Sequence, residues 1–213
     1  MSIFFKKRLP AAVATPAAGQ AALYVDSTVS ATPLLAMKDE TGTIYTLSRG
    51  LASLSAATAA ISNTEVVILN ATIPANYINI GTTYRITASG VGTTSTSPGN
   101  STFRIRFGPT TLTGNIPTSL VVAATASRTA MPWRFDALVS VRAITASGTV
   151  IGECAVWSSP STSDLFPLSS VSTTVATVVV DTTVQNLLEL TYVSGASTSS
   201  IVAHVAAIEV AKA

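Results

Sequence analysis

Nine strand-like runs between residues 64 and 213 limit most strongly how this chain can fold. They recur at roughly ten- to fifteen-residue intervals, and clusters of Gly, Pro, Asn and Ser separate them. No helical crossover stands between them, so they predict an antiparallel β-sandwich, most simply a jelly roll of two sheets. The runs are EVVILNATI, TTYRITASG, STFRIRFG, SLVVAATAS, PWRFDALVSVRAI, TVIGECAVW, STTVATVVVD, NLLELTYVSG and SIVAHVAAIEV.

Several runs alternate apolar and polar residues with a period of two. Phe103, Ile105 and Phe107 point to one face, and Arg104 and Arg106 point to the other. The next long run repeats the pattern with Trp133, Phe135, Ala137, Val139 and Val141 on its apolar face. This alternation indicates strands with one face in a core and one face in water.

Charged residues are scarce, at 10% of the chain against a usual ~25%, while hydrophobic residues make up 47%. No run approaches the ~18 consecutive apolar residues that cross a bilayer, so we expect no membrane insertion. We expect instead that copies of the chain bury much of this weakly charged surface against one another. The net charge is +2, and the cluster Lys6, Lys7 and Arg8 lies outside the strand region, so nucleic-acid binding is not expected.

Residues 1–48 form the first predicted region. Pro10 and Pro16 disfavour a helix in residues 1–20, so this part is expected to be an extended arm. The arm is either a solubilising terminus or a docking element for an acidic protein surface. ALYVD and PLLAMKD then predict two strands, and KDETGTIYTL predicts a hairpin with Gly42 in its turn. Hairpins of this size need a partner surface.

Residues 49–63 form the second predicted region, a short helix before the sandwich head of residues 64–213. Apolar positions recur there in steps of four, three, four and three residues, and we call these positions the seam: Leu47, Leu51, Leu54, Thr58 and Ile61. A helix of two heptads is marginal in isolation, so the seam predicts a trimeric coiled-coil junction. The alternative is one amphipathic helix that covers the open end of the sandwich.

The sequence offers little reactive chemistry, so we expect no enzyme activity, cofactor or metal site. His204 is the only histidine, and its apolar neighbours predict a partly buried side chain. Cys154 is the only cysteine and is expected to be a buried thiol, which makes a zinc site of the usual type improbable. GVGTTSTSPGN leads into no helix and is interpreted as a loop, and no nucleophile elbow or phosphate-binding loop occurs.

Arginines at outward positions form a candidate ligand face. If neighbouring strands bring them together, they could bind an acidic glycan or a carboxylate. The alternative is cross-strand ion pairing with Asp136 and Glu189. The candidate residues are Arg104, Arg106, Arg134 and Arg142, with Arg85 at the same outward parity.

The stretch TPAAGQAALYVDSTVSATPLLAMKDETGTIYTLS (15–48) resembles the N-terminal segments of fibres and spikes from tailed-bacteriophage virions. The matching features are the Pro-Ala-Gly opening, the ALYVD strand and the KDETGTIYTL hairpin. TTYRITASG, STFRIRFG, MPWRFDALVSVRAI and DTTVQNLLELTYVSG are similar to phrases in a jelly-roll domain of phage structural proteins. In such proteins a short trimeric coiled coil joins the N-terminal segment to a β-rich head.

The resemblance implies a virion location and a non-enzymatic, homotrimeric short fibre or capsid decoration protein. The N-terminus would anchor it to capsid, tail or connector proteins, through residues that include Phe4, Phe5, Lys6, Lys7, Arg8, Leu23, Tyr24 and Val25. The short chain favours decoration, and a tail-borne receptor-binding fibre is the alternative, with a host surface glycan as candidate partner. A secreted adhesin or carbohydrate-binding module, a glycoside-cleaving spike with two facing carboxylates, and a major capsid jelly roll are further alternatives.

Overall fold

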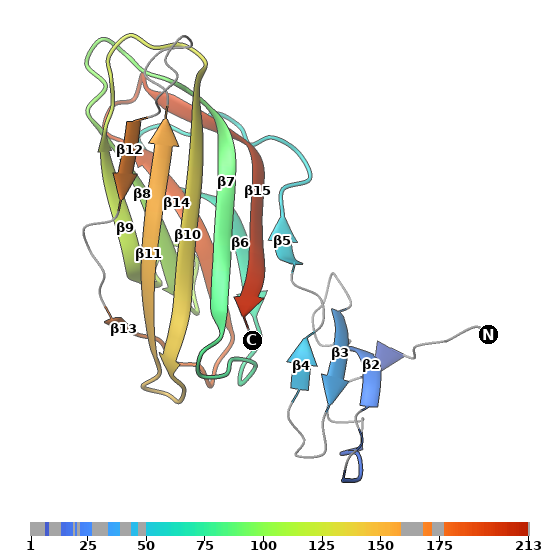
Figure 1. Cartoon of the computed structure of the whole chain (residues 1–213). Coiled ribbons are helices and arrows are strands. Elements are labelled where there is room, and N and C mark those ends of the chain that lie inside the picture. The colour runs from blue at the N-terminus through green and yellow to red at the C-terminus, as the bar shows by residue number, and fades with distance from the viewer. Residues whose placement is uncertain are drawn as a thin grey trace, which may run out of the picture.

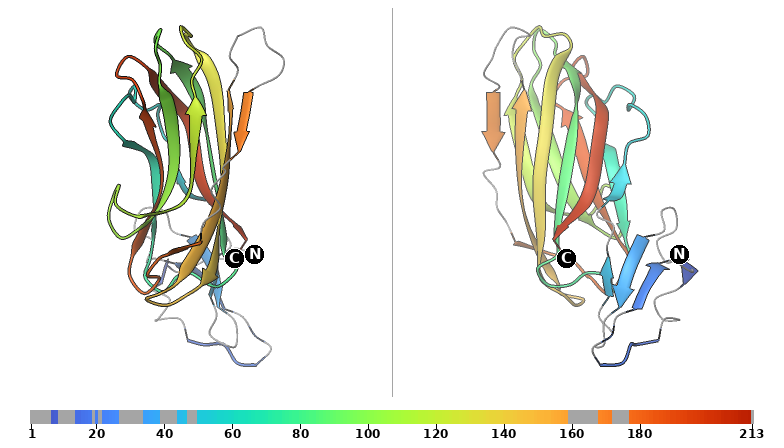
Figure 2. Two further views of the ribbon diagram at one scale, coloured as in Figure 1. Left: turned by 90° about the vertical axis from the view of Figure 1, so that its left-hand side faces the viewer. Right: turned by 45° about the vertical axis from the view of Figure 1, so that its right-hand side comes forward.

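Two antiparallel sheets face each other between residues 50 and 212 of the computed structural model and make a β-sandwich (Figure 1). The structure describes residues 7–8, 14–18, 20, 22–26, 34–38, 44–46, 50–158, 168–171 and 177–212. Seen from the side, the sheets form two layers (Figure 2). The predicted all-β sandwich is therefore confirmed.

One layer, which we call the front sheet, has the strand order β12-β11-β10-β7-β15-β5, with β13 also paired to β11. Its strands are β5 (Gly50–Ser53), β7 (Thr83–Thr93), β10 (Met131–Ala143), β11 (Thr149–Ser158), β12 (Leu168–Val171), β13 (Thr177–Val179) and β15 (Ser200–Lys212). The other layer, the back sheet, has the order β6-β14-β8-β9. Its strands are β6 (Val66–Ile73), β8 (Asn100–Gly108), β9 (Asn115–Ala123) and β14 (Asn186–Ser194).

Apolar side chains from the two sheets meet in a shared core. Phe103 of the back sheet and Phe135 of the front sheet lie with ring centroids 5.5 Å apart. The inward sets predicted from the alternation are buried in both β8 and β10. Cys154 is buried as predicted, at 3% exposure.

The predicted strands match most of the observed ones, with several differences. β12 was not predicted, and β7 runs to Thr93, so the loop predicted at residues 90–100 is wrong for its first four residues. β9 begins at Asn115, four residues before the run SLVVAATAS. Of the run at 172–181, only Thr177–Val179 is a strand, and residues 172–176 lie outside the described part of the chain. His204 is exposed, and the partly buried position predicted for it is wrong because a bulge between Ala203 and Val205 shifts the alternation of β15.

The pairings of the sandwich strands are nested in the sequence. β5 pairs with β15, β6 with β14, β7 with β10, and β8 with β9. The strands β11, β12 and β13 extend the front sheet beyond β10. The four pairings are therefore nested around the innermost pair, β8 with β9.

The helix predicted for residues 49–63 is wrong, since residues 50–63 are described and contain no helical turn. Gly50–Ser53 is strand β5, and the following segment runs along β15 in an extended form. Leu54 N donates to Ala206 O at 3.0 Å, and Ile61 N donates to Ile201 O at 2.9 Å. The unpaired edge of β15 supplies hydrogen-bond partners that outweigh the weak helix preference of a short segment.

The seam residues accordingly serve the fold of one chain. Ile61 is buried at 4% exposure, and Leu51 and Leu54 are half-buried against the same core. Thr58 is bonded to Ala203 of β15. Leu47 lies outside the described residues. The coiled-coil junction predicted from the seam is therefore wrong.

A second, smaller sheet precedes the sandwich. Its order is β1-β2-β3-β4, from β1 (Lys7–Arg8), β2 (Ala22–Asp26), β3 (Leu34–Lys38) and β4 (Ile44–Thr46). The strands predicted at ALYVD and PLLAMKD are confirmed by β2 and β3, and β3 pairs antiparallel with β4, as the predicted hairpin requires. Gly42, predicted in its turn, lies outside the described residues. The pairing of β1 with β2 is parallel, so Lys7 and Arg8 take an extended form.

The sandwich has two distinct ends. At the proximal end, Gly50 pairs with Glu209 near the finish of β15, so the N-terminal region joins the sandwich there. At the distal end, β15 starts at Ser200, and the turns 94–99, 124–130 and 195–199 lie together. Any group at the distal end is therefore remote from the point where residues 1–49 enter.

Candidate functional site

The predicted anchoring residues fall only partly on described positions. Lys7 and Arg8 belong to β1, and Leu23, Tyr24 and Val25 belong to β2. Phe4, Phe5 and Lys6 lie outside the described residues. The small sheet brings the two described groups together, because Lys7 is registered opposite Val25.

The candidate arginine face is divided between the two sheets. Arg104 and Arg106 lie on β8 of the back sheet, whereas Arg134 and Arg142 lie on β10 of the front sheet. Their strands belong to different layers, so the four residues do not form one ladder. On the front sheet, Arg85 Nη2 lies 2.6 Å from Asp136 Oδ2, which is the cross-strand ion pair expected from the sequence.

Glu65 organises the arginines of the back sheet. Its Oε1 lies 2.8 Å from Arg106 Nε, and its Oε2 lies 2.9 Å from Arg104 Nη1. The hydroxyl of Thr191 donates to Oε1 at 2.7 Å. The hydrogen bonds from Arg106 lower the pKa of the Glu65 carboxyl below its usual value, even though partial burial opposes this shift. These arginines are thus engaged within the chain, and their partner is Glu65 rather than the predicted Glu189.

A hollow lies at the distal end of the sandwich, between the two sheets. We call it the distal pocket, and its volume is about 220 Å³. Three aromatic residues line it: Phe103, Trp133 and Tyr192. Small and hydroxylated residues complete the lining, among them Gly92, Thr94, Ser101, Val122, Ala123, Ala124, Thr125, Met131, Val156, Ser158, Ser200 and Ile201.

The aromatic residues of the pocket pack on one another. The Phe103 ring centroid lies 5.4 Å from that of Trp133 and 4.9 Å from that of Tyr192. The Tyr192 hydroxyl and Ser101 Oγ form a buried hydrogen bond of 2.8 Å. Burial raises the pKa of Tyr192, so its hydroxyl stays protonated at neutral pH.

Trp133 contributes a buried indole N–H to this region. The residue is 5% exposed, and its Nε1 has no hydrogen-bond partner among the described residues. An unpaired buried donor is costly, by about 1–3 kcal/mol. The indole N–H is therefore an unpaired donor that is buried in the packing beside the pocket.

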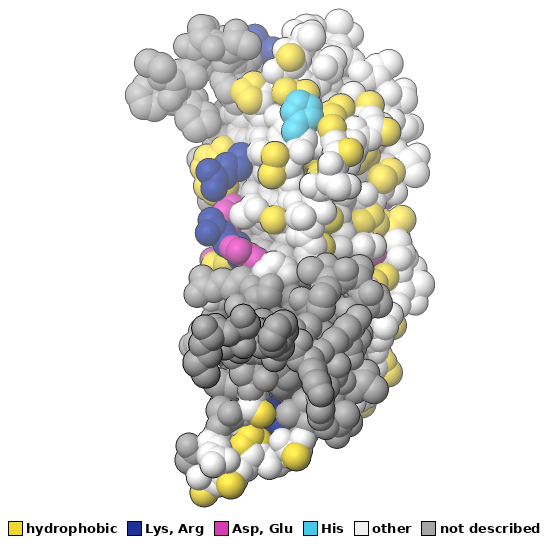
Figure 3. All heavy atoms as spheres, turned by 90° about the vertical axis from the view of Figure 1, so that its right-hand side faces the viewer, with side chains coloured by type: hydrophobic (Ala, Val, Ile, Leu, Met, Phe, Trp, Pro, Cys, Tyr) yellow, Lys and Arg dark blue, Asp and Glu magenta, His cyan; other side chains and the backbone are white. Residues whose placement is uncertain are grey.

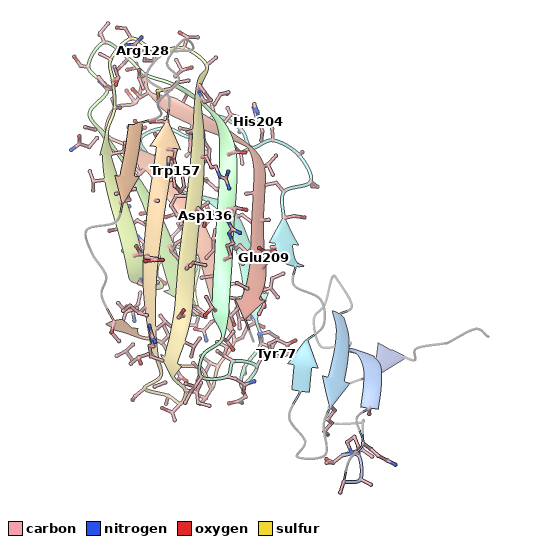
Figure 4. The ribbon with its side chains drawn as sticks, viewed as in Figure 1. Tyr77, Arg128, Asp136, Trp157, His204 and Glu209 are labelled. Carbon is pink, nitrogen blue, oxygen red and sulfur yellow. The ribbon has the colours of Figure 1, made fainter. Side chains whose placement is uncertain are left out.

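Hydrogen bonds between the distal turns hold the rim of the pocket. Thr94 N donates to Arg128 O at 2.8 Å, and Arg128 N donates to Thr94 Oγ1 at 2.9 Å. Ser95 N donates to Ser199 Oγ at 3.0 Å. Figure 4 shows Arg128 at this end of the molecule. The turns after β7, β9 and β14 are therefore tied into one rim.

The lining of the distal pocket is uncharged, and this determines which ligands suit it. Among the described residues that line the pocket, none is Asp, Glu, Lys, Arg or His. The lining thus offers aromatic surface and hydroxyl groups, which suits binding of an uncharged molecule. Facing carboxylates, which a glycoside-cleaving spike would need, do not occur in this lining.

The sequence did not predict this pocket, although it predicted some of its parts. The alternation placed Phe103 and Trp133 in the core, and GVGTTSTSPGN was interpreted as a loop. The lining residues come from β7, β8, β9, β10, β11, β14 and β15. Only the three-dimensional pairing of these strands brings them to one end.

Two kinds of site do not occur in the parts of the chain that the structure describes. Across those ranges, no three or more His, Cys, Asp or Glu residues are grouped so that they could hold a metal ion. Within the same ranges, no helix has the length and apolarity to cross a membrane.

Comparisons with known proteins identify no relative of this chain. No family model matches its sequence, no curated protein matches it, and no solved structure matches its fold.

Proposed function

We propose that the protein is a structural component of a bacteriophage virion, a homotrimeric short fibre or decoration protein that is anchored to the capsid through its N-terminus. The proposal rests on the resemblance of residues 15–48 to virion fibres and on one feature of the sandwich surface. That feature is a flank without charged side chains, which provides a contact surface between copies of the chain.

The uncharged flank consists of residues 50–64 and 200–208, which lie side by side along β15. It contains no Asp, Glu, Lys or Arg. Val205, with 61% exposure, is the most exposed valine among the described residues and lies in this flank. In Figure 3 most of the charged side chains lie near the left margin of this side, and the surface directly around the histidine is uncharged with scattered hydrophobic groups.

Such a surface favours self-association. Alanine and serine dominate the exposed positions from Ser53 to Ala60, so two copies can approach closely. Burying apolar surface favours association, and no Asp, Glu, Lys or Arg side chain in the flank must lose its hydration. We therefore assign to the flank the role in trimer contacts that the sequence had suggested for a helix.

The nested pairing of the sandwich strands supports a jelly roll. Four nested pairs, from β5 with β15 to β8 with β9, are what a folded-over antiparallel ribbon produces. In this reading the strands β11 to β13 are an addition to the front sheet. A jelly-roll head would project from the virion while the small sheet and the residues before it make the anchor.

Cryo-electron microscopy of purified virions tests the location. We expect three copies of the sandwich around a local threefold axis on the capsid, with their proximal ends toward the shell. Density at the tail would replace decoration with the fibre alternative. Absence of the chain from virions would refute the proposal.

A matched pair of charge substitutions tests the flank. Val205→Arg should convert the trimer to monomers in light scattering, because a buried unpaired charge opposes assembly. Val121→Arg is the control, because Val121 is 56% exposed on β9 of the back sheet, away from the flank. Equal masses for the two variants would exclude the flank as the contact surface.

A tail-borne receptor-binding fibre is the second candidate function. The observation that favours it is the distal pocket, which lies at the end of the sandwich opposite the entry of the N-terminal region. A fibre presents its free end to the host, so a preformed pocket at that end suits recognition of a surface molecule.

A further inference from the structure

We infer that the distal pocket binds a single uncharged sugar residue, presented by a glycan. The inference deepens the receptor-binding candidate and rests on it only for the source of the glycan. Whether the pocket takes a sugar is a property of the isolated protein and can be tested without the virion.

The absence of charge in the lining selects an uncharged ligand. The only ionisable group among the described lining residues is the phenol of Tyr192. The guanidinium of the neighbouring Arg128 is not part of the lining. A carboxylate or phosphate inside this lining would lose its hydration, and the lining itself supplies no cation, since Arg128 belongs to the rim. The arginines once considered for an acidic ligand lie on the outer faces of the sheets, and Arg104 and Arg106 are bound to Glu65.

The distribution of aromatic and hydroxyl groups selects a sugar among uncharged ligands. Aromatic rings of Phe103, Trp133 and Tyr192 provide a surface on which the C–H face of a pyranose ring can pack. Hydroxylated residues stand around them, and a sugar ring carries hydroxyls at its own rim that can pair with such groups. The hydroxyls of Thr94, Ser101 and Tyr192 already pair within the chain, and a purely apolar ligand would bury the remaining hydroxyls of the lining without offering them partners.

The size of the pocket limits the ligand to one ring. A volume of about 220 Å³ corresponds to roughly seven water molecules at ~30 Å³ each. That space accommodates one six-membered ring with its substituents. The rest of a glycan would extend past the distal turns into solvent.

The rim of the pocket is prepared for binding. The bonds from Thr94 to Arg128 and from Ser95 to Ser199 fix it, so less conformational freedom is lost when a ligand binds. A ligand with about a dozen heavy atoms in such a site is expected to have a Kd of millimolar order.

Tryptophan fluorescence of the full chain provides the test. The chain has two tryptophans, and Trp157 is not among the residues that line the pocket. The variant Trp157→Phe therefore leaves Trp133 as the only indole, which reports on the pocket. Titration with galactose, glucose and N-acetylglucosamine should change its emission with saturation, whereas glucuronate should not.

Two glycine variants decide whether the signal comes from the pocket. A methyl group at Gly92 would meet Ile201 Cγ2 at 3.5 Å and Met131 Cε at 3.8 Å, which are ordinary contacts, so Gly92→Ala should fold and narrow the pocket. We expect it to weaken sugar binding at least about five-fold. Gly50→Ala is the matched control, because open space surrounds that position at the other end of the sandwich.

The titrations distinguish sugar binding in the pocket from other responses. Saturable binding of a neutral sugar that Gly92→Ala weakens and Gly50→Ala preserves would support the inference. Three results would overturn it: no response to any of the sugars at about 100 mM, which is far above the expected Kd, stronger binding of glucuronate, or a response to cyclohexanol alone. Sugar binding by a protein that virions lack would refute the proposed function and leave this inference standing.

Discussion

Thr58 holds both hydrogen-bonding groups of the Ala203 backbone. Its amide donates to Ala203 O at 2.9 Å, and its Oγ1 accepts from Ala203 N at 3.0 Å. Ala203 is fully buried, beside the bulge of β15. A threonine side chain thus completes the edge of the front sheet at a point where the backbone ladder is irregular.

Replacing this hydroxyl should destabilise the sandwich. Thr58→Val keeps the shape of the side chain but leaves the buried Ala203 N–H unpaired, so the free energy of unfolding should fall by about 1–3 kcal/mol. Urea unfolding followed by fluorescence measures the change. Thr58→Ser retains the hydroxyl and is the control, and equal stabilities of the two variants would contradict the role of Oγ1.

The Glu65 network should make stability depend on pH. The pKa of Glu65 is lowered in the folded state, chiefly by its hydrogen bonds from Arg106, so the stabilisation is complete above the pKa of the unfolded carboxyl, near ~4.3. It is lost as pH falls through the lowered folded pKa. Glu65→Gln should therefore reduce the free energy of unfolding at pH 7 by about 1–3 kcal/mol.

The difference in free energy of unfolding between Glu65→Gln and the natural chain should shrink as the pH is lowered, because the side chain at position 65 is then neutral in both. Urea unfolding at a series of pH values measures it. Glu153→Gln removes an exposed carboxyl from β11 and controls for the change in net charge. A difference that stays constant down to the lowest pH would show that Glu65 acts through packing instead.

Two glycines of β7 should respond differently to an added methyl group. At Gly90 the new Cβ would overlap the carbonyl oxygen of Val202, which belongs to the neighbouring strand and cannot move alone. Gly90→Ala should therefore lower the free energy of unfolding by about 1–3 kcal/mol or more, as overpacking does. Thermal unfolding compares it with Gly92→Ala, for which we expect a small change, and similar melting temperatures would contradict the close approach of β7 and β15.

Local alternation made the strands and their inward residues predictable. Phe103, Phe135 and Trp133 could be placed in the core because a period of two is a property of adjacent residues. The side of the sandwich to which each strand belongs was not predictable in this way. Arg104 and Arg134 therefore shared one candidate face in the sequence, while the pairing of distant strands places them on different sheets.

The helix prediction for residues 50–63 was wrong for the same physical reason, because pairing with a distant strand is not visible in the local sequence. Steps of three and four residues between Leu51, Leu54 and Ile61 fit a helix, and nothing nearby in the sequence reveals the unpaired edge of β15. That edge is contributed by residues about 140 positions later, as in the hydrogen bond from Ile61 N to Ile201 O. The distal pocket was missed because its walls also come from distant strands.

The position of β15 has a consequence for how the chain reaches its fold. β15 fills the place between β7 and β5, so the front sheet cannot close until residues 200–212 have left the ribosome. Contacts between such distant parts of a chain form slowly, on a scale of ~milliseconds to seconds for β-proteins of this kind. Until then the edge of β7 and the apolar Leu51 and Leu54 stay uncovered, and an open strand edge beside apolar side chains is prone to pair with other chains.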